Sequence, residues 1–371
     1  MSTEAPVINV APAETGLGQK ITLLFLPPVD ADNTNAQSLN TREIALRLDP
    51  NRFESTLWYE NEPDARLRNR PSIRLLRLPK RRKTLRILRE QFSGYDLIAY
   101  MDYSPASYLF VHAPRWTRAR TRSLFHSEAP QAQLVNPSAL LKFLYHGVLS
   151  RCDLYTGITE FVARDISTVS PYPARIILPV GVDCKFFSPP AHRKSQVTTV
   201  LFVGTLIERK GPQLVLEAAG RFPLAHFRIV GGARDGYDSV LKQMISDRKL
   251  RNVTLEGPRS QSDVLTIMRE SNIFLLPSRL EGLPKVTLEA AATGLPCVVF
   301  RDYQTPSVVD GITGFQVSKL EDMFECLGQL IQDPDLRARM GDAARKHAES
   351  FDWDLVSKKW EDAYLAAALQ R

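Results

Sequence analysis

The stretch LLPSRLEGLPKVTLEAAATGLPCVV, residues 275–299, predicts a strand, a short loop, a helix and a second strand in close succession. Its first apolar run ends at Pro277 and Ser278, and Pro284 is placed to begin the helix. Short continuous apolar runs of this kind are typical of strands that are buried on both faces of a parallel sheet. Strands and helices in alternation therefore predict an α/β fold.

The same alternation runs along the whole chain. It starts with ITLLFLPP at 21–28 and, after a proline-bearing polar stretch, restarts with TTVLFVGT at 198–205. A chain of 371 residues exceeds the usual size of one domain. We therefore predict a mobile tail over 1–19, an N-terminal Rossmann-like domain over 20–183, a linker over 184–196, a C-terminal Rossmann-like domain over 197–352 and a closing helix over 353–371.

Composition narrows the class of protein. The four cysteines are widely spaced, with no CxxC pair and no histidine at metal-ligand spacing. The N-terminus lacks a basic region followed by an apolar run, and other apolar runs fall far below the roughly 20 residues that a membrane helix needs. We therefore expect a reduced, cytoplasmic protein with no secretion signal and no membrane span.

Positive charge is concentrated in the first half of the chain. The net charge is +7, and between Asp64 and Arg122 there are fifteen Lys or Arg against four Asp or Glu. One interpretation is a solvated face with helix-stabilising arginines. The other is attraction to an anionic partner, such as the inner leaflet of a membrane, a phospholipid-linked acceptor or nucleic acid.

The residues that follow the predicted strands are candidates for a site, because ligands of open α/β sheets bind at the carboxyl ends of the strands. After the strand that ends at Ser278, a helix start supplies unpaired N–H groups that suit a diphosphate. Glu281 in the loop and Glu289 on the helix could each accept hydrogen bonds from two hydroxyls of a sugar or ribose. Earlier in the chain, LFVGTLIERKG at 201–211 places Arg209 and Lys210 where they would neutralise a diphosphate leaving group.

With these residues in place, the EGLP and LEA context resembles the E-x7-E motif of glycosyltransferase family 4, the glycosyl transferases group 1, which are retaining enzymes of the GT-B fold. The resemblance covers about 21–364. It implies two Rossmann-like domains facing across a cleft, with FDWDLVSKKWEDAY at 351–364 as part of a helix that crosses back to the first domain. It also implies a hexosyltransferase that moves a sugar from a nucleoside diphosphate sugar to an acceptor hydroxyl with retained anomeric configuration. No metal or other cofactor is expected, since Lys210 and the helix start can replace the charge of a cation.

The resemblance assigns roles to single residues. Glu281 would contact the donor sugar, Glu289 the ribose and Lys210 the diphosphate. The implied donor-binding set is completed by Gly204, Thr205, Arg209, Gly257, Arg259, Ser278, Gly282, Leu283, Pro284, Lys285 and Val286. Thr205 stands where the family usually has an arginine, so either Arg209 supplies a second cation or the site works with one.

The first half offers fewer candidates. His126 in RSLFHSEA follows a strand and is expected to point into the cleft near the reacting sugar, where the resemblance implies a catalytic histidine. A structural role is the alternative for a lone histidine. Asp32 and Asn35, in the loop where the family usually has a Gly-Gly turn, are acceptor-binding candidates because Asp and Asn tolerate unusual backbone angles and bind hydroxyls.

The acceptor is expected to be a sugar, a glycolipid or a lipid-linked saccharide in cell-surface polysaccharide or glycolipid synthesis. The arginine-rich segment 66–89 suggests peripheral attachment to the anionic inner face of the plasma membrane. Two alternatives are a sugar-nucleotide epimerase of the same fold and a basic nucleic-acid-binding protein. Nucleic acid is not expected as a partner, because no aromatic-interleaved basic motif is present.

Overall fold

The computed structural model describes residues 20–31, 36–100, 109–112, 121–129, 143, 147–148, 150–167, 176–191 and 197–369. The chain forms two compact units. Unit 1 contains the chain up to Val180 and again from Trp353, and unit 2 contains Gly181–Asp352. The call on the tail over 1–19 lies outside the described residues.

Unit 1 is built on a seven-stranded sheet in the order β3-β2-β1-β4-β5-β6-β7, and all of its strand pairs are parallel. Its strands are β1 (Ile21–Pro28), β2 (Phe53–Tyr59), β3 (Ile73–Arg77), β4 (Leu97–Tyr100), β5 (Arg122–Ser127), β6 (Leu154–Gly157) and β7 (Ile176–Ile177). Its helices include α1 (Ala36–Ala45), α2 (Ala65–Arg68), α3 (Lys83–Gln91), α6 (Glu160–Ser167) and α13 (Trp353–Leu369). In β1 the consecutive residues Leu23, Leu24 and Phe25 have no exposed surface, as expected for a strand covered on both faces.

Unit 2 repeats this plan with a six-stranded sheet in the order β10-β9-β8-β11-β12-β13. Its strands, all in parallel pairs, are β8 (Thr199–Val203), β9 (His226–Val230), β10 (Val253–Gly257), β11 (Ile273–Leu276), β12 (Cys297–Phe300) and β13 (Gly314–Val317). Its helices are η2 (Glu208–Lys210), α7 (Pro212–Arg221), α8 (Tyr237–Asp247), α9 (Gln261–Glu270), α10 (Lys285–Ala292), η3 (Arg301–Tyr303), α11 (Leu320–Gln332) and α12 (Pro334–Glu349). The predicted α/β class with parallel sheets is confirmed.

Each sheet reverses its strand order next to its first strand. In unit 2 the first strand, β8, lies between β9 and β11, and in unit 1 β1 lies between β2 and β4. The loops that leave the carboxyl ends of two such strands diverge to opposite faces of the sheet, which opens a crevice where ligands of this fold bind. In unit 2 these are the loops after β8 and β11, and they carry most of the predicted donor-binding residues.

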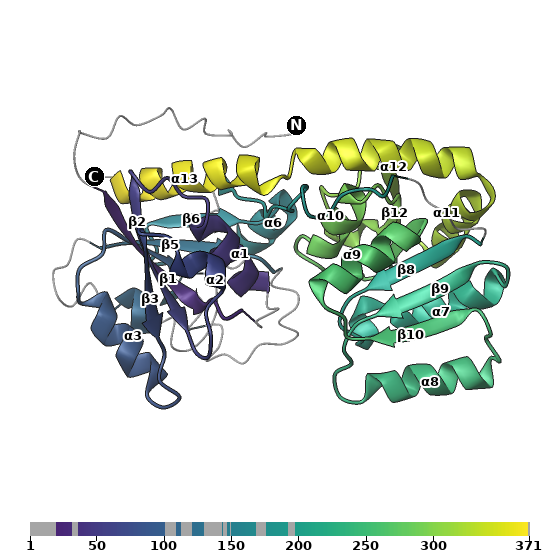
Figure 1. The fold of residues 1–371 in the computed structure, drawn as a ribbon, viewed down its shortest axis with the longest axis horizontal. Helices are drawn as coiled ribbons and strands as arrows, with labels where there is room; N and C mark the ends of the chain where they lie inside the picture. The colour runs from purple at the N-terminus through teal and green to yellow at the C-terminus, as the bar shows by residue number, and fades with distance from the viewer. Residues whose placement is uncertain are drawn as a thin grey trace. The chain divides into compact units, whose positions relative to one another are not determined.

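The last helix, α13, belongs to unit 1 and packs on β4, β5 and α1 (Figure 1). Trp360 of α13 has no exposed surface, and its Nε1 donates a hydrogen bond of 3.0 Å to the Pro179 carbonyl. At the edges of the helix, Asp354 accepts from Arg47 at 3.1 Å and Glu361 pairs with Arg52 at 2.7 Å. The final helix thus completes the core of the first unit.

The chain enters unit 2 a few residues before the predicted linker. Arg345 of α12 donates to the carbonyls of Cys184 and Phe187, and Phe187 is buried. The segment therefore packs in unit 2 from Gly181 onward. Its polar, proline-bearing composition indicated a linker, but one arginine far along the chain satisfies its backbone.

Among the residues that the structure describes, no helix is both long and apolar enough to cross a membrane.

We expect Trp360→Ala to destabilise unit 1 by about 3–5 kcal/mol, because it removes a fully buried indole and its hydrogen bond to Pro179. Urea unfolding measures this change. Leu355→Ala, on the same helix but at a side chain that is 51% exposed, is the matched control and should change stability by less than about 0.5 kcal/mol. Equal unfolding free energies for the two variants would contradict this packing.

Candidate functional site

The loops after β8 and β11 lie next to each other, because these strands are hydrogen-bonded neighbours. Gly211, which ends the first loop, has φ +78°, and a Cβ there would lie 2.4 Å from the Pro277 carbonyl oxygen and 2.9 Å from its Cγ. Only glycine allows both this backbone angle and this approach. The contact holds η2 against the end of β11, so Arg209 and Lys210 lie beside the Glu281 loop.

Three donors converge on one carboxylate oxygen. Oε1 of Glu281 lies 2.7 Å from Lys210 Nζ and 3.5 Å from an Arg209 guanidinium nitrogen, and it accepts a 2.7 Å hydrogen bond from Ser278 Oγ. Arg209 also donates to the Leu280 carbonyl. Glu281 is only 7% exposed, and among the described residues no donor reaches its second oxygen. The cluster therefore keeps two cations and one free carboxylate oxygen at the same edge of the sheet.

The start of α10 is fixed by buried hydroxyl groups. Thr287 Oγ1 donates to the Pro284 carbonyl at 2.6 Å, so it accepts the 2.6 Å hydrogen bond from Ser307 Oγ. Ser307 Oγ in turn accepts from Thr305 Oγ1 at 2.8 Å, and all three side chains are buried. No side chain caps this helix start at Pro284. The first turn of α10 is therefore held rigidly, with the dipole of a helix start facing the loop that precedes it.

Glu289 is the fifth residue of α10 and is partly buried. Burial raises the pKa of its carboxyl above the ordinary value, and the charge of Lys285, one turn earlier, opposes this shift. Within the part of the chain that the structure describes, its carboxylate has no hydrogen-bond partner. Glu289 is thus available to bind a ligand hydroxyl.

A row of glycine backbone lies along the same edge. Gly204 donates its N–H to the Val230 carbonyl at 3.0 Å, and Gly231 donates to the Gly257 carbonyl at 2.9 Å. A Cβ at Gly231 would lie 1.8 Å from the Gly204 carbonyl oxygen. Sequence analysis named Gly204 and Gly257 but missed Gly231, although the Gly-Gly pair after HFRIV was a signal for close backbone approach.

The remaining predicted donor residues of unit 2 differ in surroundings. Thr205 is partly exposed beside Gly204. Arg259 pairs with Glu256 at 2.8 Å, and Glu256 also pairs with Arg228 at 2.7 Å, so a ligand would compete for Arg259 with an internal carboxylate. At the α10 end, Gly282, Leu283 and Pro284 are buried, whereas Lys285 and Val286 are partly exposed.

Tyr303, which sequence analysis did not consider, lies behind this site at the end of η3. Its side chain has no exposed surface, and among the described residues its hydroxyl has no hydrogen-bond partner. Burial, reinforced by the negative charge of Glu281, raises the pKa of Tyr303 well above its ordinary value. Its phenol is therefore a neutral neighbour of the Glu281 carboxylate.

His126 in unit 1 does not emerge at an open face, which corrects the expectation from its strand-end position. The imidazole has no exposed surface and packs edge-on against Trp360, with ring centroids 4.6 Å apart. Its Nδ1 lies 3.0 Å from Thr156 Oγ1, and because Thr156 donates to the Phe125 carbonyl at 3.3 Å, Nδ1 carries the hydrogen. Burial lowers the pKa of His126 to about 3. The acceptor candidates Asp32 and Asn35 lie outside the described residues.

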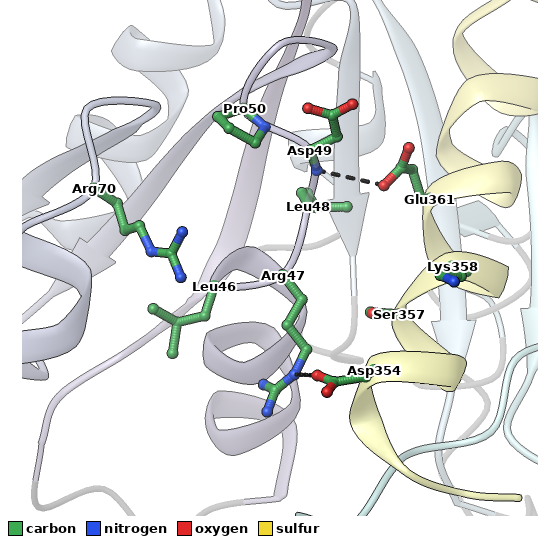
Figure 2. Close-up of a pocket in the computed structure, with 10 residues that line it drawn as sticks. All are labelled: Leu46, Arg47, Leu48, Asp49, Pro50, Arg70, Asp354, Ser357, Lys358 and Glu361. Atoms are coloured by element: carbon green, nitrogen blue, oxygen red, sulfur yellow. Dashed lines mark hydrogen bonds and ion pairs between the residues drawn. The ribbon is translucent and has the colours of Figure 1, made fainter.

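A cavity of about 340 Å³ lies elsewhere in unit 1, between the loop at 46–50 and α13 (Figure 2). This loop leads into the amino end of β2, opposite the edge where the predicted residues of this fold gather. Its acidic groups are paired: Asp354 with Arg47, and Glu361 with the backbone N–H of Asp49. No predicted site residue lines it. Among the described residues, no cluster of three His, Cys, Asp or Glu side chains is placed to hold a metal ion.

Comparison with known proteins identifies the family. Residues 185–347 match the model of the family "Glycosyl transferases group 1". The chain is 31% identical, over 56% of its length, to a GDP-mannose-dependent monoacylated alpha-(1-6)-phosphatidylinositol monomannoside mannosyltransferase of Corynebacterium glutamicum. It is 33% identical, over 59% of its length, to a D-inositol 3-phosphate glycosyltransferase of Mycobacterium tuberculosis. The matches span 60% and 49% of these relatives' own lengths.

Solved structures resemble the fold across most of the chain. A sucrose-phosphate synthase from Thermosynechococcus elongatus matches with a TM-score of 0.78 and 18% identity, over 94% of this chain and 98% of that one. Anabaena HepE in complex with UDP matches with a TM-score of 0.77 and 16% identity, over 94% of this chain and all of that one. At such identities the likeness shows the fold alone. The predicted GT-B fold class and the resemblance to the group 1 family are confirmed.

We expect the stability of unit 1 to depend on pH through His126. Because the pKa of this buried ring is about 3, the unfolded chain, with a histidine pKa of about 6.5, binds a proton that the folded chain does not bind between these values. Stability is therefore lost as the pH falls below about 6.5, by about 2 kcal/mol between pH 7 and pH 5. Urea unfolding at both pH values measures the loss.

His126→Asn is the matched variant, since an amide can still donate to Thr156 but does not titrate. It should lose about 2 kcal/mol less than the wild type over the same pH interval. Parallel pH profiles for the two proteins would show that the ring is accessible to protons in the folded state.

Proposed function

We propose that this chain, whose residues 185–347 are a glycosyl transferases group 1 domain, transfers a hexose from a nucleoside diphosphate sugar to an acceptor hydroxyl with retained anomeric configuration. One observation carries the proposal. Lys210 and Arg209 converge on Glu281 beside the start of α10, at the strand-order reversal of unit 2 where ligands of α/β sheets bind.

The cluster suits a diphosphate between two sets of hydroxyls. An incoming diphosphate would be bound by Lys210, Arg209 and the first N–H groups of α10, all of which favour negative charge. The free oxygen of Glu281 would then accept a hydroxyl of the donor sugar, and Glu289 the hydroxyls of the ribose. Because Arg209 reaches the same carboxylate oxygen as Lys210, it is the better candidate than Thr205 for the second cation.

The reaction places its developing charge where these cations lie. The bond between the anomeric carbon and the diphosphate oxygen breaks, and a new bond forms to the acceptor oxygen on the same face of the sugar. The acceptor proton passes to the leaving diphosphate. Lys210 and Arg209 stabilise the departing negative charge, a task for which no metal ion is required in this proposal.

The relatives suggest the class of acceptor. One is named for a phosphatidylinositol mannoside and another for inositol 3-phosphate, so a glycolipid, a lipid-linked saccharide or a sugar acceptor at the inner face of the plasma membrane is proposed. One relative's name contains GDP-mannose, and HepE was solved with UDP. Both UDP-sugars and GDP-sugars therefore belong in the first donor screen.

We expect two variants to separate binding from chemistry. Lys210→Gln should lower kcat on the order of 10²-fold, because it removes a cation from the leaving group as charge develops. Glu289→Gln should instead raise KM for the donor roughly tenfold with little change in kcat, because a ribose contact is equal in the ground and transition states. Steady-state transfer assays with product chromatography measure both constants.

Lys242→Gln is the control, since this exposed lysine of α8 pairs only with Asp238 on the same helix. It should match the wild type. Turnover of Lys210→Gln within about twofold of wild type would remove the proposed role of this cluster. Conversion of the donor without any acceptor would indicate an epimerase instead.

A further inference from the structure

Helix α3 exposes large apolar side chains among cations. Leu85 is 61% exposed and Phe92, at the helix end, is 46% exposed, with the exposed Arg89 between them. Spacings of four and three residues place these three side chains on one side of the helix. Ile87 and Gln91 face the opposite way and are buried. Arg81 and Arg82 stand exposed at the start of the same side, and these five residues are here called the α3 face.

The α3 face carries unbalanced positive charge. The one acidic residue of the helix, Glu90, is buried and is bound by Tyr95 and Arg74 at 2.9 and 3.0 Å. Within the described part of the chain, none of the three arginines of the α3 face has an ion-pair partner. The charge is therefore directed outward rather than neutralised by the fold.

Protection of the sheet edge explains only part of this pattern. The helix follows β3, which is the edge strand of the sheet, and exposed arginines such as Arg77 on an edge strand discourage pairing with other strands (Figure 1). That role does not require Leu85 and Phe92 to face solvent. A nucleic-acid surface would use the arginines but would gain nothing from an exposed leucine.

We propose that the α3 face docks on the surface of an anionic lipid bilayer. Leu85 and Phe92 enter the boundary between head groups and acyl chains, and Arg81, Arg82 and Arg89 lie at the lipid phosphates. An amphipathic helix with a basic face and a few large apolar residues binds such surfaces through both terms, so each is necessary. The docked helix lies in the plane of the surface and spans nothing.

Vesicle sedimentation with the full chain tests the docking without donor or acceptor, so its result is separate from that of the transfer assay. Wild-type protein should bind vesicles of equal parts phosphatidylglycerol and phosphatidylcholine at low salt, but not vesicles of phosphatidylcholine alone. The double variants Leu85→Ser with Phe92→Ser and Arg82→Gln with Arg89→Gln should each bind roughly tenfold more weakly. Leu224→Ser, which changes a 90% exposed leucine of unit 2, should bind like the wild type.

Leu85→Trp reports insertion directly, because its fluorescence emission should shift to shorter wavelength on anionic vesicles. No shift, or unweakened binding by either double variant, would overturn the proposal. Binding to RNA or DNA without any binding to vesicles would overturn it in favour of a nucleic-acid surface. Circular dichroism should show the wild-type fold for every variant, since all the changed side chains are exposed.

Discussion

The close approach of Gly211 to Pro277 is the contact on which the candidate site depends. Because no side chain fits between them, η2 lies directly against the end of β11. The approach brings Lys210 to the Glu281 carboxylate and joins loops that are about seventy residues apart in the chain. The strand-order reversal between β8 and β11 then decides where this cluster faces.

The cluster is organised before any ligand arrives. Partly buried cations are costly unless they are paired, and Glu281 supplies the pairing while Ser278 fixes the orientation of its carboxylate. Behind it, the hydroxyl groups of Thr287 and Ser307 hold the first turn of α10. Groups that are already oriented stabilise developing charge without a reorganisation cost, which is the physical basis of the proposed transfer.

The sequence predicted this site better than it predicted unit 1. Glu281 and Lys210 could be brought together from strand ends alone, because adjacent parallel strands deliver their following loops to one edge. His126 was also at a strand end, but its environment is set by Trp360, far along the chain, and long-range packing of this kind leaves no local signal. Tyr303 was missed for the same reason, since burial beside Glu281 is not visible in an Arg-Asp-Tyr tripeptide.

The central claim is that Lys210 binds a diphosphate. Titration calorimetry can compare a nucleoside diphosphate with its parent nucleoside, using the base that binds the wild type best, on wild type and on Lys210→Gln. The account predicts that the variant binds the nucleoside diphosphate roughly tenfold or more weakly and the nucleoside unchanged. Equal affinity of both proteins for the nucleoside diphosphate, or an equal loss for both ligands, would contradict it.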